Sequence, residues 1–297
     1  MTSGFRQDAL IRAMPAVFVL IWSTGFIVAR FGMPFAPPMK FLALRYVFSV
    51  LCFAVWAVLA RVALPANRRQ VAHLAVVGVL IQAGYLGGVW TAVKLGMGAG
   101  LVALLVSLQP VLTAVWVSSR GGRVSARQWA GLALGFAGLA LVVWHKLGAG
   151  EVHADNLLFT LIALGSITVG TLYQKRFVTP CDVRTASLVQ LAAAFVVTLP
   201  LALLESEAIQ WNGQLAGSMA WSVLALTLGG SSLLYLLIQR GAATAVTSLL
   251  YLVPPCTAVM AWVLFSEPLT ALTLAGMALT AFGVSLVVRA PRSTSRA

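Results

Sequence analysis

Residues 248–268 read SLLYLVPPCTAVMAWVLFSEP, and this stretch decides which kind of fold the chain can adopt. Two adjacent prolines, Pro254 and Pro255, stand near its middle, yet the apolar residues continue beyond them to Phe265. A proline inside a helix removes a backbone hydrogen bond and clashes with the preceding turn, so a helix in water would end there. Inside a membrane a broken helix persists where neighbouring helices or a wet cavity satisfy the freed carbonyls. The stretch therefore indicates a membrane segment beside such a cavity.

The composition of the whole chain supports this interpretation. Of the 297 residues, 60% are hydrophobic and 9% are charged, whereas globular domains carry roughly 25% charged residues. Runs of about 20 apolar residues are long enough to cross a hydrocarbon core of about 30 Å. The sequence therefore predicts an all-α polytopic membrane protein in contact with a lipid bilayer. The loops are short, so no soluble domain is expected.

Several other classes of protein are excluded by the same residues. The net charge of +13 would suit a nucleic-acid partner, but the basic residues are scattered between apolar runs and form no basic face. Three scattered histidines offer no catalytic or metal-binding cluster, so we expect no enzyme activity, no metal and no cofactor. The cysteines form no CxxC motif and are interpreted as small hydrophobic residues. The first apolar run has no convincing cleavage site and is expected to remain as a span.

Reading the apolar runs between charged and turn-forming clusters gives ten expected transmembrane helices. They cover residues 13–32, 39–60, 71–94, 97–118, 126–145, 155–175, 183–204, 216–239, 242–265 and 270–289.

The distribution of charge over the expected loops gives an orientation. Fifteen of the 20 Lys and Arg residues fall on the side that holds both termini, and five fall on the other side with five of the seven acids. Cytoplasmic loops carry an excess of Lys and Arg. We therefore expect both termini to be cytoplasmic in the inner (plasma) membrane of a bacterium.

A shift of 145 residues aligns the chain with itself and places Pro110 on Pro255. Between residues 98–144 and 243–289 no gap is needed, and 12 of 47 positions are identical. Each half holds five expected spans, so equivalent spans enter the membrane in opposite directions. The sequence thus predicts two inverted five-helix repeats, residues 1–147 and 148–297. Such repeats are typical of secondary transporters, whose substrate sites lie at the repeat interface near mid-membrane.

Three segments carry a resemblance to a known family. They are WSTGFIVARFGMP with the following LALRY, AGLVALLVSLQPVLTAVW, and TSLLYLVPPCTAVMAWVLFSEPLT. The chain resembles the EamA branch of the drug/metabolite transporter superfamily over all ten spans, and within it the YddG-type amino-acid exporters. The resemblance implies export of amino acids or similar small metabolites. One departure is that Gly122 stands where the second half has Glu267.

Candidate substrate-binding residues are polar or aromatic side chains within the expected spans. In the third span, Gln82 is the most telling, because an amide in hydrocarbon needs a partner. Tyrosine and tryptophan near span ends could instead lie in the interfacial belts, and hydroxyls could bond neighbouring helices. The candidates are Trp22, Gln82, Tyr85, Trp90, Ser231, Tyr235, Ser248 and Tyr251. The expected helix kinks are at Pro110, Pro254 and Pro255.

Arg45 lies inside the second expected span and has two interpretations. A long basic side chain near a span end can extend to the lipid headgroups, and this is the interpretation that the sequence favours. The alternative is a counter-charge for a substrate carboxylate. The GxxxG pairs, such as Gly84 with Gly88, favour close packing within one chain over dimerisation, so a monomer is expected.

The acidic residues bear on energy coupling. No Asp or Glu falls in the middle of an expected span, whereas proton-coupled transporters usually keep a titratable group there. We therefore expect alternating access by facilitated diffusion or exchange of a small molecule. The alternatives are a proton-coupled drug/metabolite antiporter, a channel held open at both ends, and a lipid-handling flippase.

Overall fold

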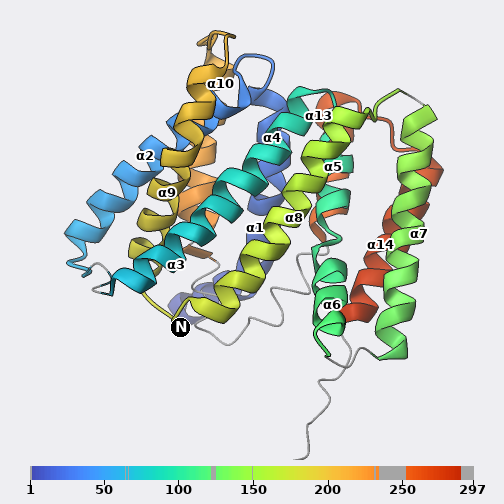
Figure 1. Cartoon of the computed structure of the whole chain (residues 1–297), viewed down its shortest axis with the longest axis horizontal. Helices are drawn as coiled ribbons and strands as arrows, with labels where there is room; N and C mark the ends of the chain where they lie inside the picture. The colour runs from blue at the N-terminus through green and yellow to red at the C-terminus, as the bar shows by residue number, and fades with distance from the viewer. Residues whose placement is uncertain are drawn as a thin grey trace, which may run out of the picture.

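The structure is a computed structural model that describes residues 2–63, 65, 67–121, 125–148, 150–230, 232–233 and 252–288. Within these residues every regular element is a helix, and the helices form one bundle (Figure 1). In the first half they are α1 (Thr2–Gly32), α2 (Pro38–Leu59), α3 (Arg68–Gly78), η1 (Val79–Leu86), α4 (Gly87–Lys94), α5 (Ala99–Val106), α6 (Gln109–Ser119) and α7 (Ala126–Gly148). In the second half they are α8 (Ala154–Phe177), α9 (Val183–Leu204), α10 (Gly213–Trp221), η2 (Ser222–Gly229), α13 (Val253–Phe265) and α14 (Ala271–Val288).

Helix occupies at least part of every segment that the sequence predicted to span the membrane. Six described helical stretches are long and apolar enough to cross a bilayer. Shorter apolar helices cover Ala16–Gly32, Val253–Phe265 and Ala271–Leu286. The membrane class is thereby supported, while the number of ten spans stays a prediction.

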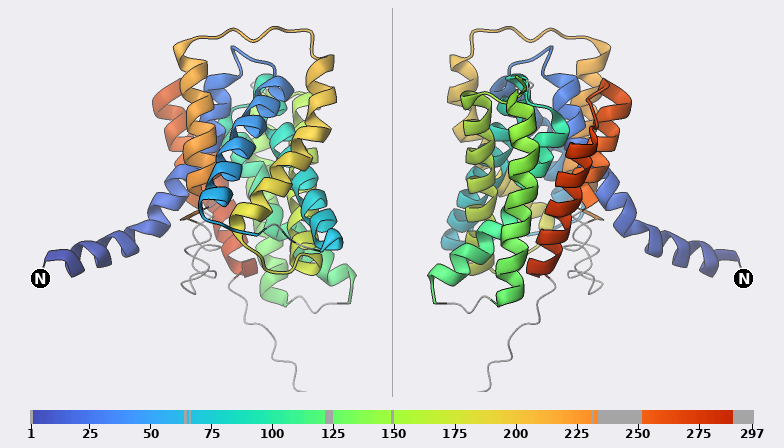
Figure 2. Two further views of the ribbon diagram at one scale, coloured as in Figure 1. Left: turned by 90° about the vertical axis from the view of Figure 1, so that its left-hand side faces the viewer. Right: turned by 90° about the vertical axis from the view of Figure 1, so that its right-hand side faces the viewer.

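The outer surface of the bundle is apolar in the way that a lipid environment requires. Trp144, Leu203 and Leu204 are each at least 76% exposed, and water-soluble proteins rarely expose large contiguous apolar patches. The largest fully buried side chains lie inside the bundle, among them Trp90 and Tyr46. Figure 2 shows the first turns of α1 extending away from this bundle.

Two of the expected spans contain a π-helical segment. The third runs without interruption through α3, η1 and α4, and the eighth begins as α10 followed by η2. A π-helix widens the backbone ring by one residue; it is rare, and it is frequent at functional sites. Shifting η1 by 143 residues gives η2, within two residues of the shift that aligns the two halves of the sequence.

The prolines at which the sequence predicted helix kinks lie in the first turns of helices. Pro110 is the second residue of α6, and a break at Ser107 and Leu108 separates that helix from α5. Pro254 and Pro255 lie in the first turn of α13. A proline fits this position because the first turn of a helix has no intrahelical partner for its N–H groups. Apart from Leu252, the residues that precede α13 back to residue 234 lie outside the described part.

The helices α7 and α14 cross at glycines in an antiparallel arrangement. A Cβ atom on Gly138 would lie 2.6 Å from the carbonyl oxygen of Gly276, and one on Gly283 would lie 2.5 Å from that of Gly131. As the residue number rises along α7, its partner's number falls along α14, so the two helices run in opposite directions. Small residues let helices in a membrane approach this closely.

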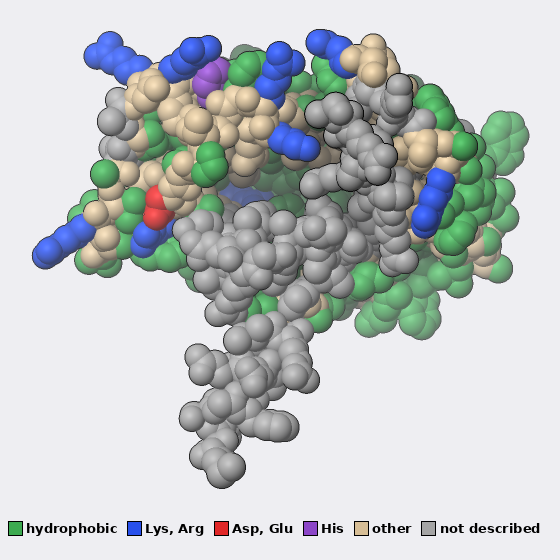
Figure 3. All heavy atoms as spheres, turned by 90° about the horizontal axis from the view of Figure 1, so that it is seen from below, with side chains coloured by type: hydrophobic (Ala, Val, Ile, Leu, Met, Phe, Trp, Pro, Cys, Tyr) green, Lys and Arg blue, Asp and Glu red, His purple; other side chains and the backbone are tan. Residues whose placement is uncertain are grey.

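Basic side chains gather around the lower face of the bundle (Figure 3). At this face α3 begins with Arg68 and Arg69, and α8 ends after Lys175 and Arg176. The opposite face holds the loop between α9 and α10, with Glu205 and Glu207. The charge asymmetry that the sequence indicated is therefore also an asymmetry of the two faces.

Candidate functional site

A cavity of about 110 Å³ lies inside the bundle at the level of both π-helical segments. Its lining residues come from α1, α2, η1, α4, α8 and η2. It is large enough for several water molecules, since one water needs about 10–15 Å³ of such space. Its wall is partly polar and partly aromatic, which is typical of a small-molecule site.

The segment η1 supplies an amide and a phenol to this cavity. Gln82 and Tyr85 both line it, and Tyr85 is buried. Neither side chain has a hydrogen-bond partner among the residues that the structure describes. The segment itself is held from α2, because the Tyr46 hydroxyl donates to the backbone carbonyl of Gln82 at 2.6 Å. Two polar groups are thus presented to the cavity by a backbone that other contacts fix.

A glycine lets this span approach α8 closely. A Cβ atom on Gly88 would lie 2.5 Å from the carbonyl oxygen of Phe159 and 2.9 Å from the Cβ of Ala163. A larger residue at position 88 would push the two helices apart. The close approach accompanies the presence of Ile167 of α8 in the cavity wall.

Arg45 of α2 also lines the cavity, and it is only 6% exposed. Its Nε and Nη2 atoms donate to the Thr227 hydroxyl oxygen at 3.3 and 3.1 Å. Thr227 belongs to η2, and its hydroxyl donates in turn to the carbonyl oxygen of Ser222 at 2.8 Å. The interpretation that Arg45 extends to the lipid headgroups is therefore wrong. The side chain turns inward because its helix face packs against η2 and α4.

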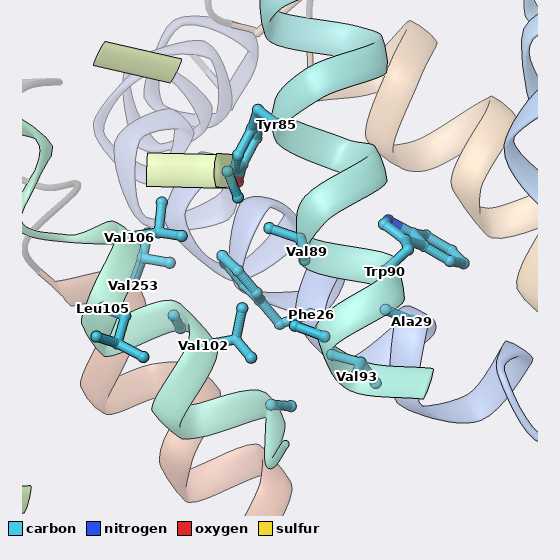
Figure 4. Close-up of a cluster of buried hydrophobic side chains, with 14 of the residues drawn as sticks. Phe26, Ala29, Tyr85, Val89, Trp90, Val93, Val102, Leu105, Val106 and Val253 are labelled. Atoms are coloured by element: carbon cyan, nitrogen blue, oxygen red, sulfur yellow. The ribbon is translucent and has the colours of Figure 1, made fainter. Parts of the chain in front are cut away.

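The aromatic residues divide between the two sides of the continuous helix that η1 and α4 form. Figure 4 shows Tyr85 and Val89 on the side of Phe26, whereas Trp90 projects from the other side. Trp90 stacks on Phe41 of α2 with ring centroids 4.5 Å apart and an angle of 26° between the planes. The guanidinium carbon of Arg45 lies 5.9 Å from the centroid of the Trp90 ring. At this distance a cation–π interaction contributes to holding the guanidinium.

The structure brings four of the eight predicted site residues together. Trp22, Gln82, Tyr85 and Trp90 all line the cavity. Trp90 is 1% exposed, so it does not lie in an interfacial belt. The other four, Ser231, Tyr235, Ser248 and Tyr251, lie outside the described residues.

Arg45 and Thr227 are the further polar contributors: the sequence left Arg45 open as a counter-charge for a substrate carboxylate, and it did not single out Thr227. A signal for Arg45 was present in α2, where Leu42, Tyr46, Ser49 and Phe53 repeat at helical spacing and are all buried. Arg45 lies on the same stripe, and a charge on a buried stripe points into the bundle. Thr227 carried no comparable signal, because threonines are common in membrane helices.

The acidic residues of the upper face hold the first turns of helices. The Glu205 carboxylate accepts the backbone N–H groups of Met39 and Lys40 at 2.9 and 2.8 Å. The Glu267 carboxylate accepts the backbone N–H of Ala99 at 3.1 Å. Carboxylates stabilise helix N-termini because those N–H groups are unpaired and carry a partial positive charge. These acids therefore tie the α9–α10 loop to α2, and the end of α13 to α5.

Ion pairs add to the contacts at this face. Lys94 pairs with Glu207 at 2.7 Å and also donates to the Met33 carbonyl oxygen at 3.0 Å. Lys146 pairs with Glu151, whose other oxygen accepts the backbone N–H of Gly98 at 3.2 Å. Each acid of the upper face named here is thus engaged with a helix end or a lysine, away from the cavity.

Comparison with known proteins gives the family of this architecture. The model of the EamA-like transporter family matches residues 13–144 and 156–289. The chain belongs to the EamA-like transporter family. The two matched stretches fit the expected repeats.

Relatives of similar length carry transporter names. The chain is 27% identical to the uncharacterised transporter YvbV of Bacillus subtilis, over 92% of this chain and 89% of that one. It is 26% identical to the uncharacterised inner membrane transporter YedA of Escherichia coli K12, over 95% and 92%. It is 26% identical to a "probable amino-acid metabolite efflux pump" of Salmonella typhimurium, over 95% of each. A solved crystal structure with 15% identity shares the fold, with a TM-score of 0.62 over 92% and 94% of the two chains.

Proposed function

We propose that this EamA-family transporter carries amino acids or similar small metabolites through the cavity by alternating access. The observation that carries the proposal is the cavity at the level of two π-helical segments, η1 and η2, from corresponding spans of the two halves. Secondary transporters place their substrate sites near mid-membrane between repeats. The Gln82 amide and the Tyr85 hydroxyl, which have no hydrogen-bond partner among the described residues, are groups that a bound metabolite would satisfy.

The arrangement of repeats is part of the proposal. Residues 1–147 and 148–297 form two inverted five-helix units, ten spans in all, related by a pseudo-two-fold axis. The antiparallel crossing of α7 and α14 supports this, because Gly131 meets Gly283 and Gly138 meets Gly276. The shift of 145 residues converts one of these pairs into the other. In a two-fold interface, residue i of one unit contacts residue j of the other, and residue j of the first contacts residue i of the second.

The proposed direction is export across a bacterial inner membrane by a monomer. The basic lower face faces the cytoplasm together with both termini, since positive charge accumulates on that side. The Salmonella typhimurium relative named "probable amino-acid metabolite efflux pump" supports export as the physiological direction. Because none of the described residues that line the cavity is an acid, transport runs down the substrate gradient or by exchange.

Counterflow in liposomes tests this function. Purified protein is reconstituted into vesicles loaded with a mixture of unlabelled amino acids, and uptake of each radiolabelled amino acid is followed. A carrier takes up label against its gradient when the vesicles are loaded, and a channel does not. Uptake should persist when a protonophore collapses the pH gradient. Absence of loading-dependent uptake for every amino acid would overturn the proposal.

A matched pair of variants connects the activity to the cavity. Gln82→Leu removes the amide from the cavity wall and should lower counterflow several-fold. Gln174→Leu makes the same chemical change at an exposed position near the end of α8 and should leave it unchanged. Equal rates for both variants would remove Gln82 from the transport site while leaving the transport activity itself established.

A further inference from the structure

Among the residues that the structure describes, Arg45 is a buried cation without an acidic partner. Its only hydrogen bonds within the described residues go to the neutral Thr227 hydroxyl. The ion pairs of the described residues involve other cations, namely Lys94, Lys146 and Arg184. An isolated charge in a membrane interior is costly, and such groups mark substrate or ion pathways.

The remainder of the chain offers no acid to neutralise Arg45. The sequence contains seven acids, and none of them falls within residues 208–266 or after residue 267. The five acids between residues 150 and 210 and Glu267 lie at helix ends or in loops. Asp8 precedes Trp22 by 14 residues along α1, which corresponds to about 21 Å of helix. The counter-charge of Arg45 therefore has to come from outside the chain.

We propose that Arg45, with Thr227 and Trp90, is the anchor for a carboxylate on the transported molecule. This inference rests on the proposed transport function and names its substrate class. A guanidinium presents a planar fork of N–H groups that matches a carboxylate in a two-point contact. The Thr227 hydroxyl and the Trp90 ring fix the plane of that fork, and Phe41 fixes the ring.

The rest of the cavity defines the other part of the ligand. Beside Arg45 the wall is formed by Trp22, Phe26, Tyr85 and Leu226, which suit an apolar or aromatic body. No described lining residue is an acid, so among these residues an α-ammonium group would find amide, hydroxyl and aromatic groups but no carboxylate. We therefore infer that the carboxylate is essential for binding and that the ammonium group contributes less.

Competition in the counterflow assay measures this preference. The probe is the radiolabelled amino acid with the largest wild-type counterflow, and the competitors are its amide, its decarboxylated amine and its deaminated acid. The anchor predicts that the deaminated acid competes within a few-fold of the parent amino acid. The amide and the amine should be at least about tenfold weaker, which corresponds to loss of one charge-assisted contact.

Two substitutions test whether Arg45 is the group responsible. Arg45→Gln should weaken the parent acid at least about tenfold and abolish the preference for acid over amide. Arg45→Lys should not restore it, because an ammonium lacks the fork. The control is Arg30→Gln, which removes a guanidinium that lies near Phe265 and outside the cavity. This control should keep the preference of the wild type.

The outcomes separate the two proposals. If the wild type carries amino acids but amide and acid compete equally, or if Arg45→Gln keeps the preference, the anchor is wrong and transport stands. If Arg45→Gln lowers transport of acid and amide alike, Arg45 acts as a structural residue and the anchor is also wrong. If the wild type shows no counterflow with any amino acid, the transport function fails, and the anchor fails with it.

Discussion

The glycine crossing between α7 and α14 allows a quantitative test of the pseudo-two-fold arrangement. In Gly138→Ala the new Cβ atom would lie 2.6 Å from the Gly276 carbonyl oxygen and 2.8 Å from the backbone N of Thr280. In Gly283→Ala it would lie 2.5 Å from the Gly131 carbonyl oxygen. Ordinary contacts begin near 3.4 Å, so each variant must separate two backbones by most of an ångström. Overpacking of this kind costs about 1–3 kcal/mol.

The two substitutions should destabilise the protein by similar amounts, because the shift of 145 residues converts one site into the other. The measurement is the free energy of unfolding in detergent micelles, from denaturant titration. The control is Gly165→Ala in α8, where the new Cβ atom would meet nothing within 4 Å. There alanine should raise the stability by about 0.5–1 kcal/mol, since glycine weakens a helix interior. If Gly138→Ala and Gly283→Ala were as stable as this control, the close antiparallel crossing would be refuted.

Three further predictions concern charged residues. Arg45→Met should leave the ligand-free protein at least as stable as the wild type in the same titration, because it removes an uncompensated buried charge; a loss of more than about 1 kcal/mol would contradict that reasoning. Glu205→Gln should lower the stability of the protein by about 1 kcal/mol, because it weakens the cap of α2. Melting curves measure this, with Glu207→Gln as the control that leaves the cap intact. Hydrogen bonds from Arg184 lower the pKa of Asp182 below its ordinary value, so the contribution of Asp182 to stability is present above that value and is lost as the pH falls through the lowered pKa. The stability difference between wild type and Asp182→Asn should accordingly be small at pH 7, because the pair is partly exposed, and should vanish in strong acid.

The fold could be predicted from the sequence to the extent that hydrophobicity decides it. Apolar runs of about 20 residues leave few alternatives to membrane helices, so helix occupies at least part of every predicted span. The interruptions within the helices were harder to predict from the sequence. A proline such as Pro110 signals an interruption but not where the preceding helix ends. The π-helical segments had no signal, because an apolar run has the same composition whether its backbone bonds close at four or five residues.

The candidate site was predictable where a single side chain is anomalous in its own helix. Gln82 and Tyr85 are polar groups in an apolar run, and this alone marked them. Arg45 was equally visible, but its direction depends on which face of α2 packs against the bundle. That choice comes from tertiary contacts with Trp90 and Thr227, which lie 45 and 182 residues further along the chain. The local sequence pattern shows that a polar residue lies in an apolar helix. Long-range packing decides whether its side chain faces the lipid or the cavity.

The placement of charge explains how one cavity could serve both transport and selectivity. The acids of the upper face, such as Glu205 and Glu267, accept backbone N–H groups at helix starts. They stabilise those helices and do not line the cavity. In the ligand-free state Arg45 has no acidic partner among the described residues. A carboxylate that binds it therefore gains more binding free energy than it would from an arginine that is already paired. A ligand can shift a conformational equilibrium only by its differential affinity for the two states. Because Arg45 joins α2 to η2 through Thr227, a carboxylate bound there contacts elements of both proposed repeats. Any rocking of one repeat against the other would change that contact, and the binding energy of the carboxylate would thereby be coupled to the movement.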